Sequence, residues 1–323
     1  MDTDAKMLSD TWRSLRHNSS LRANLFRDIS RITLSLARHT FPHIGSLRMD
    51  DRGFVRLSNR PLTLRLQHLE NEGIPTQISR GQLYFTSDAY ILDLLACYDS
   101  KLRHQPNSML DFVDGCSQMA AVTALRATHS HYLQRDFRYG PFIFMLTDLH
   151  QSNIFVDENW NVKYIIDLEW TCTQPIEMLR APYWLTDRSV DNLLPEDGLE
   201  EFTKMHAEFL ESFEKEEKKM QDRDPNFNIP LFGRQFTDIM RSCWENGSFW
   251  FFYALENPKG LFSLFYYHLL PRYGPTDPNF YNGFCSYWAV DAAELVGKKL
   301  KDKEDYDIKL REAFQKESEG SQR

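Results

Sequence analysis

The sequence predicts a mostly helical α+β protein in which small β-hairpins lie among longer helices. Most of the 323 residues fall in segments whose apolar side chains recur at helical spacing. Short apolar runs that favour strands lie near the middle, at residues 142–146, 154–156 and 162–166. Because no repeat or low-complexity linker divides the chain, we expect one domain over residues 1–313. Residues 314–323 are polar, and we expect them to form a disordered tail.

The N-terminal part is expected to contain three helices and a hairpin. Residues 9–39 should form the first helix, in which four apolar residues share one face: Leu25, Ile29, Ile32 and Leu36. Residues 45–57 should form a hairpin that turns at Asp50-Asp51-Arg52-Gly53. Residues 86–100 and 111–133 should form the next two helices.

The central strands should bring two polar residues together. The runs 154–156 and 162–166 flank a polar turn, which predicts a hairpin. Asn153 precedes the first of these strands, and Asp167 follows the second. Antiparallel pairing therefore places Asn153 and Asp167 at the same end of the hairpin, where they could share one metal ion.

The C-terminal part should be helical. The expected helices cover residues 198–220, 236–244, 248–256, 261–269 and 281–300. The most apolar window, residues 249–270, contains Glu256 and Lys259 near its middle, which favours two buried helices over a membrane span. The aromatic cluster from Trp244 to Tyr253 either packs in a helical core or forms a wall of a substrate pocket.

Composition narrows the classes of partner. The net charge is −8, with acidic and basic residues interspersed, which disfavours a general nucleic-acid binder. The five cysteines are scattered and none forms a CxxC pair, so a reducing compartment is favoured and we expect a cytoplasmic protein.

Asp148, Asn153 and Asp167 suggest a chemistry by their types and order. Phosphoryl transfer from a nucleotide needs a carboxylate that orients the attacking hydroxyl, and an amide oxygen and a second carboxylate that hold magnesium on the phosphates. The spacing from Asp148 to Asn153 is that of the protein-kinase catalytic loop. A chance match at these spacings is on the order of a few per cent in a chain of this length.

The stretch from Thr147 to Trp170 resembles the aminoglycoside phosphotransferase family, whose members are choline-kinase-like and protein-kinase-like. That family's loop reads H-G-D-L-H-P-x-N and is followed by a hairpin and an I-D-W or I-D-x-E block. Here Asp148-Leu149-His150 and Asn153 match the loop, and Ile166-Asp167-Leu168-Glu169 matches the block. More loosely, residues 41–47 and the aromatic run near Trp250 resemble fungal members.

The resemblance implies the helical C-terminal lobe of a protein-kinase-like fold, with hairpins that carry the active-site residues. It implies ATP-dependent transfer of a phosphoryl group to a hydroxyl of a small molecule. Asp148 would orient that hydroxyl, and Asn153 and Asp167 would bind Mg²⁺ and through it the nucleotide. His150 would either orient the loop through a hydrogen bond or pack within it. Glu169 would be a supporting carboxylate or a structural salt-bridge partner.

Two features depart from the family's pattern. Leu146 stands where the family usually has histidine, which serves mainly as a loop scaffold. Upstream of Asp148 the sequence has no G-x-G-x-x-G and no strand-borne lysine of the V-A-I-K type, the elements that grip ATP. We therefore expect a chain without the N-terminal lobe, inactive or weakly active, and prone to self-association through an exposed cleft. The alternative is a truncated, non-catalytic pseudokinase that binds a ligand or a partner.

Overall fold

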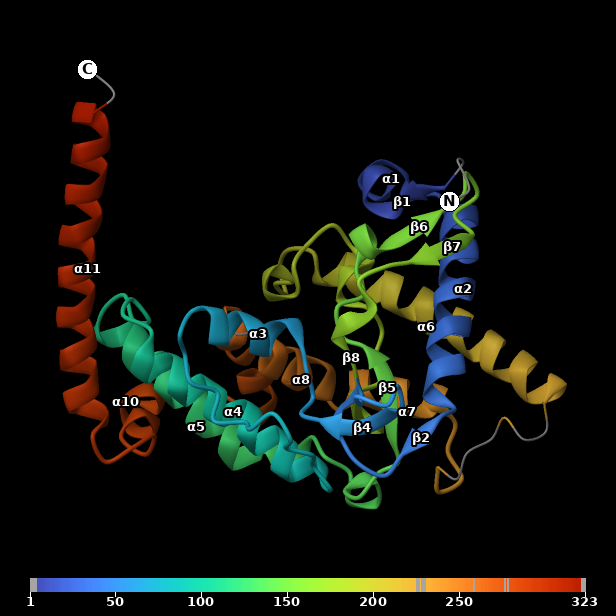
Figure 1. Ribbon diagram of the computed structural model, residues 1–323, viewed down its shortest axis with the longest axis horizontal. Coiled ribbons are helices and arrows are strands. Elements are labelled where there is room, and N and C mark those ends of the chain that lie inside the picture. Colours follow the sequence, from blue (N-terminus) through green and yellow to red (C-terminus); the bar gives the residue numbers. More distant parts are fainter. Residues whose placement is uncertain are drawn as a thin grey trace.

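Helices make up most of the described chain, and small antiparallel sheets lie among them (Figure 1). The computed structural model describes residues 5–224, 227, 231–257, 259–275, 277 and 279–320. The helices are α1 (Leu8–Leu15), α2 (Ser19–Ala37), α3 (Leu64–Asn71), α4 (Ser87–His104), α5 (Phe112–Thr128), α6 (Leu199–Arg223), α7 (Phe236–Glu245), α8 (Ser248–Glu256), α9 (Leu261–Leu264), α10 (Phe280–Cys285) and α11 (Ala292–Gly320). The predicted fold class, mostly α with small β elements, is confirmed.

The strands form three small sheets. The strands are β1 (Lys6–Met7), β2 (Thr40–Phe41), β3 (Ser46–Met49), β4 (Val55–Asn59), β5 (Phe142–Leu146), β6 (Ile154–Val156), β7 (Val162–Ile165) and β8 (Thr171–Pro175). The sheet orders are β1-β6-β7, β2-β5-β8 and β3-β4, and all pairs are antiparallel. β5 lies at the centre of its sheet and pairs with β8 along its whole length, so the loop after β5 starts from a fixed position. The predicted hairpins at residues 45–57 and 154–166 are both present.

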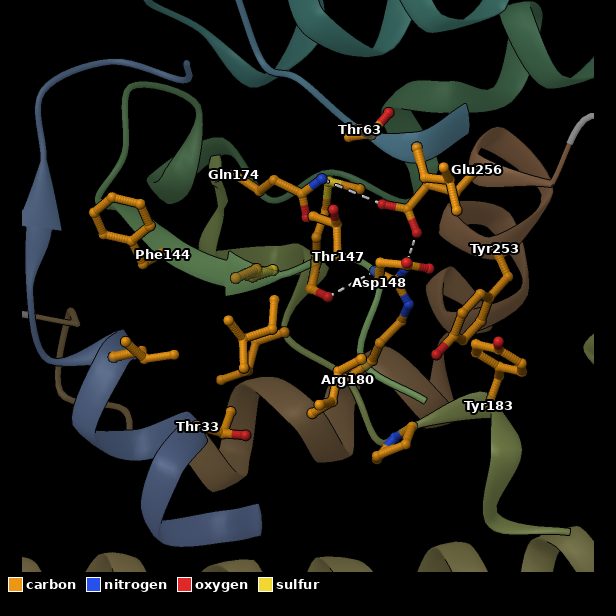
Figure 2. Close-up of a pocket in the computed structure, with 18 of the residues that line it drawn as sticks. Thr33, Thr63, Phe144, Thr147, Asp148, Gln174, Arg180, Tyr183, Tyr253 and Glu256 are labelled. Atoms are coloured by element: carbon orange, nitrogen blue, oxygen red, sulfur yellow. Dashed lines mark hydrogen bonds and ion pairs between the residues drawn. The ribbon is translucent and has the colours of Figure 1, made fainter. Parts of the chain in front are cut away.

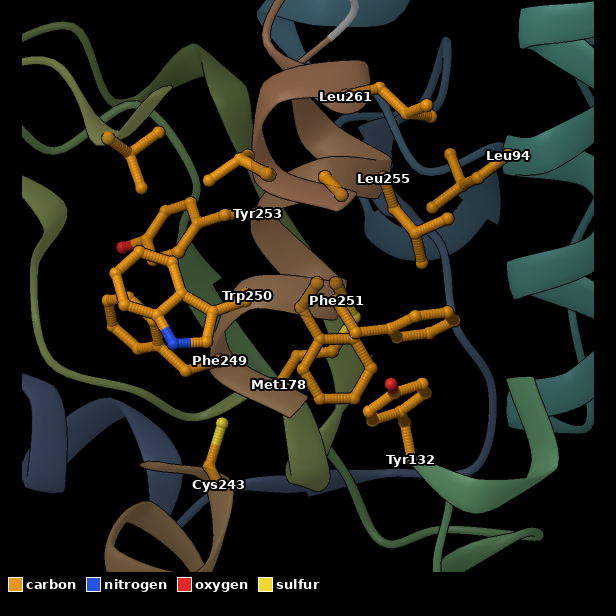
Figure 3. Packing of buried hydrophobic residues seen from close by; sticks show 14 of the residues in the cluster. Leu94, Tyr132, Met178, Cys243, Phe249, Trp250, Phe251, Tyr253, Leu255 and Leu261 are labelled. Atoms are coloured by element: carbon orange, nitrogen blue, oxygen red, sulfur yellow. The ribbon is translucent and has the colours of Figure 1, made fainter. Parts of the chain in front are cut away.

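The aromatic run forms the core around α8. Residues 248–255 are all buried, because this helix is apolar around its whole circumference. Figure 3 shows Phe249, Trp250 and Phe251 projecting from α8, with Tyr132 beside them. The Tyr132 and Phe251 rings stack with centroids 4.5 Å apart. The core interpretation of this cluster is confirmed, and Tyr253 additionally lines a cavity.

Two of the predicted helices are each divided in two. The helix predicted over residues 9–39 is interrupted between α1 and α2, where the Asn18 side chain accepts hydrogen bonds from the N–H groups of Ser20 and Leu21 and so begins a new helix. The helix predicted over residues 281–300 is interrupted between α10 and α11. There Trp288 Nε1 donates to Asp99 on α4 over 2.7 Å, which holds the connection against that helix. The prediction of continuous helices was wrong at both places.

The C-terminal helix α11 stands at one end of the molecule beside α5 and α10, while α1 and the β6–β7 hairpin lie at the other end (Figure 1). α11 extends into residues 314–320, for which the sequence predicts disorder. This segment differs from the prediction because Ala, Gln, Lys and Glu favour a helix once one has started. Residues 1–4 and 321–323 lie outside the described part. None of the described helices has a stretch long and apolar enough to cross a membrane.

Candidate functional site

The loop after β5 is held by hydrogen bonds on both sides of Asp148. Thr147 Oγ1 donates to the Trp170 carbonyl over 2.5 Å, and Trp184 Nε1 donates to the Leu149 carbonyl over 2.8 Å. The Asp148 side chain itself is 21% exposed. These contacts supply a scaffold for the loop, in which Leu146 is the residue before Thr147.

Asn153 connects the loop to the hairpin. Its side chain is buried, and its Nδ2 donates to the Asp148 carbonyl over 2.9 Å. The Asn153 carbonyl accepts from the Ile166 N–H over 3.0 Å, next to Asp167. Antiparallel pairing of β6 with β7 therefore brings Asn153 and Asp167 to one end of the hairpin, as predicted. The amide oxygen Oδ1 is the side-chain atom that Asn153 can offer to a cation.

Asp167 adopts an uncommon backbone conformation. Its φ and ψ angles are 56° and 50°, in the left-handed region that a non-glycine residue rarely adopts. Such strain often accompanies a functional position. Asp167 is exposed, and it lines a small space of about 10 Å³ together with Asp148.

His150 and Glu169 differ in how firmly they are tied to the loop. His150 Nδ1 accepts from the Ser152 N–H over 3.3 Å, and its Nε2 lies 4.0 Å from an Asp148 carboxylate oxygen. The hydrogen bond from the Ser152 N–H supports the interpretation in which His150 orients the loop. Glu169 is exposed, and among the described residues it forms no ion pair, so the salt bridge considered for it is not formed in this structure.

The environment of Asp148 favours its neutral form more than water does. Burial raises the pKa of the Asp148 carboxyl above its ordinary value. The nearby His150 and Arg65 side chains act to lower this pKa, whereas the negative charges of Asp167 and Glu169 add to the rise.

A cavity of about 140 Å³ opens beside Asp148 (Figure 2). Apolar side chains from α2 and β5 form part of its wall. Its polar lining residues are Thr33, Thr63, Arg65, Thr147, Asp148, Gln174, Arg180, Tyr183, Tyr253 and Glu256. Asp148 also lines the small space shared with Asp167, as do its neighbours Leu146, Thr147 and Leu149, so this loop forms part of the wall of both spaces.

Sequence reasoning missed the pair of charged residues inside this cavity. Arg180 and Glu256 form an ion pair, and their side chains are only 10% and 17% exposed. Arg180 follows β8, and Glu256 is the last residue of α8, so 76 positions separate them in the chain. The available signal was Glu256 itself, a carboxylate that ends an otherwise apolar helix.

Three tryptophans pack together next to the loop. Trp12 of α1 stacks on Trp160 of the hairpin turn, with ring centroids 5.4 Å apart, and meets Trp184 edge-on at the same distance. Trp160 Nε1 donates to Thr11 over 3.1 Å. Because Trp184 also binds the Leu149 carbonyl, this cluster joins α1, the hairpin and the loop into one packed unit.

The donor set at the hairpin end fits magnesium. One amide oxygen and one carboxylate are hard oxygen ligands, and Mg²⁺ is commonly held by one or two carboxylates together with the phosphates of its substrate. Among the described residues there is no group of three or more His, Cys, Asp or Glu side chains that could hold a metal ion. Further ligands, either water molecules or phosphate oxygens of a substrate, would complete the coordination of an ion held by Asn153 and Asp167. Comparison of the chain with protein-family models, curated proteins and solved structures found no match.

Proposed function

We propose that this chain is a phosphotransferase of the aminoglycoside-phosphotransferase type, built as the helical lobe of a kinase-like fold. In this proposal it transfers the γ-phosphoryl group of ATP to a hydroxyl of a small molecule. The position of Asp148 supports the proposal, because Asp148 lines both the cavity of about 140 Å³ and the small space shared with Asp167. In-line transfer requires a carboxylate at the boundary between acceptor and nucleotide.

Each residue then has a distinct role. The Asp148 carboxylate accepts a hydrogen bond from the acceptor hydroxyl and orients its oxygen. Asn153 fixes the Asp148 backbone through its Nδ2 and offers Oδ1 to the metal, while Asp167 offers its carboxylate. Bound Mg²⁺ would neutralise the phosphate charge. His150 keeps the loop in place by accepting the Ser152 N–H.

The alternative function is binding without catalysis. The 323 residues contain no G-x-G-x-x-G, so the backbone loop that usually covers ATP phosphates is not encoded in them. Positioning and charge neutralisation by that loop and its lysine supply much of the rate enhancement. We therefore expect this chain to bind Mg-ATP weakly and to turn over slowly.

Nucleotide binding separates the two functions. Isothermal calorimetry of the full chain with Mg-ATP should give weak, millimolar binding, and Asp167→Asn should weaken it by about tenfold or more. Asp197→Asn is a matched control, because Asp197 is 61% exposed and, among the residues that the structure describes, its side chain pairs with Arg188. Undetectable binding at millimolar nucleotide would refute the enzyme proposal for this chain and leave the binding function.

Turnover tests the role of Asp148. Any ATP-dependent transfer followed by phosphorus NMR should fall by about 10²–10⁴-fold in Asp148→Asn, the usual contribution of a positioned acid–base group. Mg-ATP binding should persist in this variant. Equal rates for wild type and Asp148→Asn would show that the carboxylate does not orient the acceptor.

A further inference from the structure

The cavity beside Asp148 contains its own charge compensation. Figure 2 shows Glu256 between Gln174 and Arg180, with a contact drawn to each. Glu256 Oε2 pairs with Arg180, and Glu256 Oε1 accepts from Gln174 Nε2 over 3.3 Å. Both carboxylate oxygens are thus engaged, so Glu256 has little left to offer a positively charged ligand.

Arg180 also occupies the aromatic face that a cation would use. Its guanidinium carbon lies 4.1 Å from the centroid of the Tyr253 ring, while Nη1 donates to the Met178 carbonyl over 2.8 Å. Tyr183 meets Tyr253 edge-on, with centroids 5.7 Å apart. An ammonium ligand is held by a free carboxylate or a free aromatic face. Glu256 and Tyr253 are already paired with Arg180. The other carboxylate of the lining is Asp148, on which the positive charge of Arg65 acts.

The groups that remain suit hydroxyls. The other charges in the lining are Arg65 and Asp148, one of each sign, so the cavity as a whole is neutral. Threonine hydroxyls at Thr33 and Thr63 add groups that can both donate and accept.

We propose that the cavity binds a small neutral acceptor rich in hydroxyl groups, a polyol or a sugar, and that the Arg180–Glu256 pair excludes charged acceptors. That this ligand accepts a phosphoryl group rests on the proposed function, whereas the preference for a neutral ligand rests on the charges and contacts of the cavity alone. Outside the Arg180–Glu256 pair, a charged ligand would meet Arg65 and Asp148, which have opposite signs, so either ligand charge faces a like charge as well as an opposite one. Desolvation of the ligand charge is then poorly compensated, which disfavours it against an uncharged molecule of equal size.

Three sugars of one shape but different charge test this preference. Glucose, glucosamine and glucuronate are titrated by calorimetry into the full chain with Mg²⁺ and without ATP, at a pH where the amine is protonated. We expect the wild type to bind glucose about tenfold more tightly than either charged sugar. Arg180→Gln should move the preference to glucosamine, because Glu256 then lacks its partner. Glu256→Gln should move it to glucuronate for the corresponding reason.

The double variant Arg180→Gln/Glu256→Gln should prefer the neutral sugar again, and it keeps the test valid if either single variant fails to fold by circular dichroism. Arg188→Gln, which breaks an ion pair away from the cavity, should leave all three affinities unchanged. Wild-type binding of glucosamine or glucuronate at least as tight as that of glucose, or no saturable glucose binding, would overturn the proposal. Glucose preference without any phosphoryl transfer would instead overturn only the proposed function.

Discussion

The Asp148 carboxyl sets the pH range in which the proposed chemistry can work. Its ionised form is the stronger acceptor for the hydrogen bond of an acceptor hydroxyl and the form that can take up a proton, and burial raises its pKa. The rate should therefore fall as pH decreases through a value above the ordinary aspartate pKa of about 3.9. A profile of kcat/KM against pH checks this, and an acid limb at or below the ordinary value would contradict the environment described for Asp148.

Glu177 gives a second titration that concerns stability. It is 2% exposed, and burial raises the pKa of its carboxyl from 4.5 to about 8. Since the folded-state pKa is the higher one, the folded chain binds the extra proton between these values. The Glu177 contribution to stability is therefore intact below about pH 4.5 and is lost as pH rises to about 8.

Replacing Glu177 with glutamine should remove this dependence. Relative to wild type, Glu177→Gln should gain stability between about pH 5 and 8, on the order of 4 kcal/mol in total. Urea unfolding at several pH values measures the difference, with exposed Glu200→Gln as the control. Parallel curves for wild type and Glu177→Gln would show that Glu177 titrates normally.

At the residue scale, the sequence identifies candidate site residues when these residues lie close together along the chain at a fixed spacing. Asp148, Asn153 and Asp167 could be recognised because five residues and one hairpin separate them. Arg180 and Glu256 could not, because only the packing of α8 against the segment after β8 brings them together. Their roles in binding remain predictions.

At the element scale, the link between Trp184 and the loop can be tested separately from the packing of its ring. Trp184→Phe keeps an aromatic ring but leaves the Leu149 carbonyl without its donor, which should cost about 1–2 kcal/mol of stability. We also expect weaker Mg-ATP binding, because the loop that carries Asp148 and Asn153 loses an anchor. Unfolding curves and calorimetry measure the two effects.

Trp288→Phe is the matched control, since it removes an indole hydrogen bond to Asp99 at a distance from the loop. It should lower stability by a similar amount without changing nucleotide binding. Equal effects of both variants on Mg-ATP binding would argue against a special role for the Trp184 contact.

The boundaries of elements were predictable to different degrees. β5 was predicted correctly at both ends because polar or turn-forming residues flank its apolar run. The breaks at Asn18 and near Trp288 were missed for different reasons. Asn18 starts α2 through its own side chain, whereas the connection at Trp288 is set by a contact with α4 that no local pattern encodes.

At the scale of the whole molecule, α11 should add little stability over its outer half. Leu295 and Val296 are buried near its start, but every described side chain from 308 to 314 is exposed. Deleting residues 309–323 should therefore change the free energy of unfolding by no more than about 0.5 kcal/mol. Leu295→Ala should lower it by about 2–5 kcal/mol. A large loss on deletion would show that the outer half packs against the rest of the chain.

The mixed architecture was predictable from composition and periodicity, but the arrangement of its parts was not. Helical spacing identifies which segments form helices, yet it does not say that α11 lies at the opposite end from the β6–β7 hairpin (Figure 1). Self-association through an exposed cleft stays a prediction. So does the kinase-like character of the helical lobe.

The stacking of Trp12 on Trp160, with Trp184 edge-on, has an optical consequence. Indole rings 5.4 Å apart share their excited states, so this cluster should dominate the near-ultraviolet circular dichroism of the chain. The Trp184 ring also donates a hydrogen bond to the carbonyl of Leu149, the residue after Asp148. Any ligand that shifts this backbone changes the coupling between the rings, and the protein thereby carries an intrinsic spectroscopic reporter of its own site.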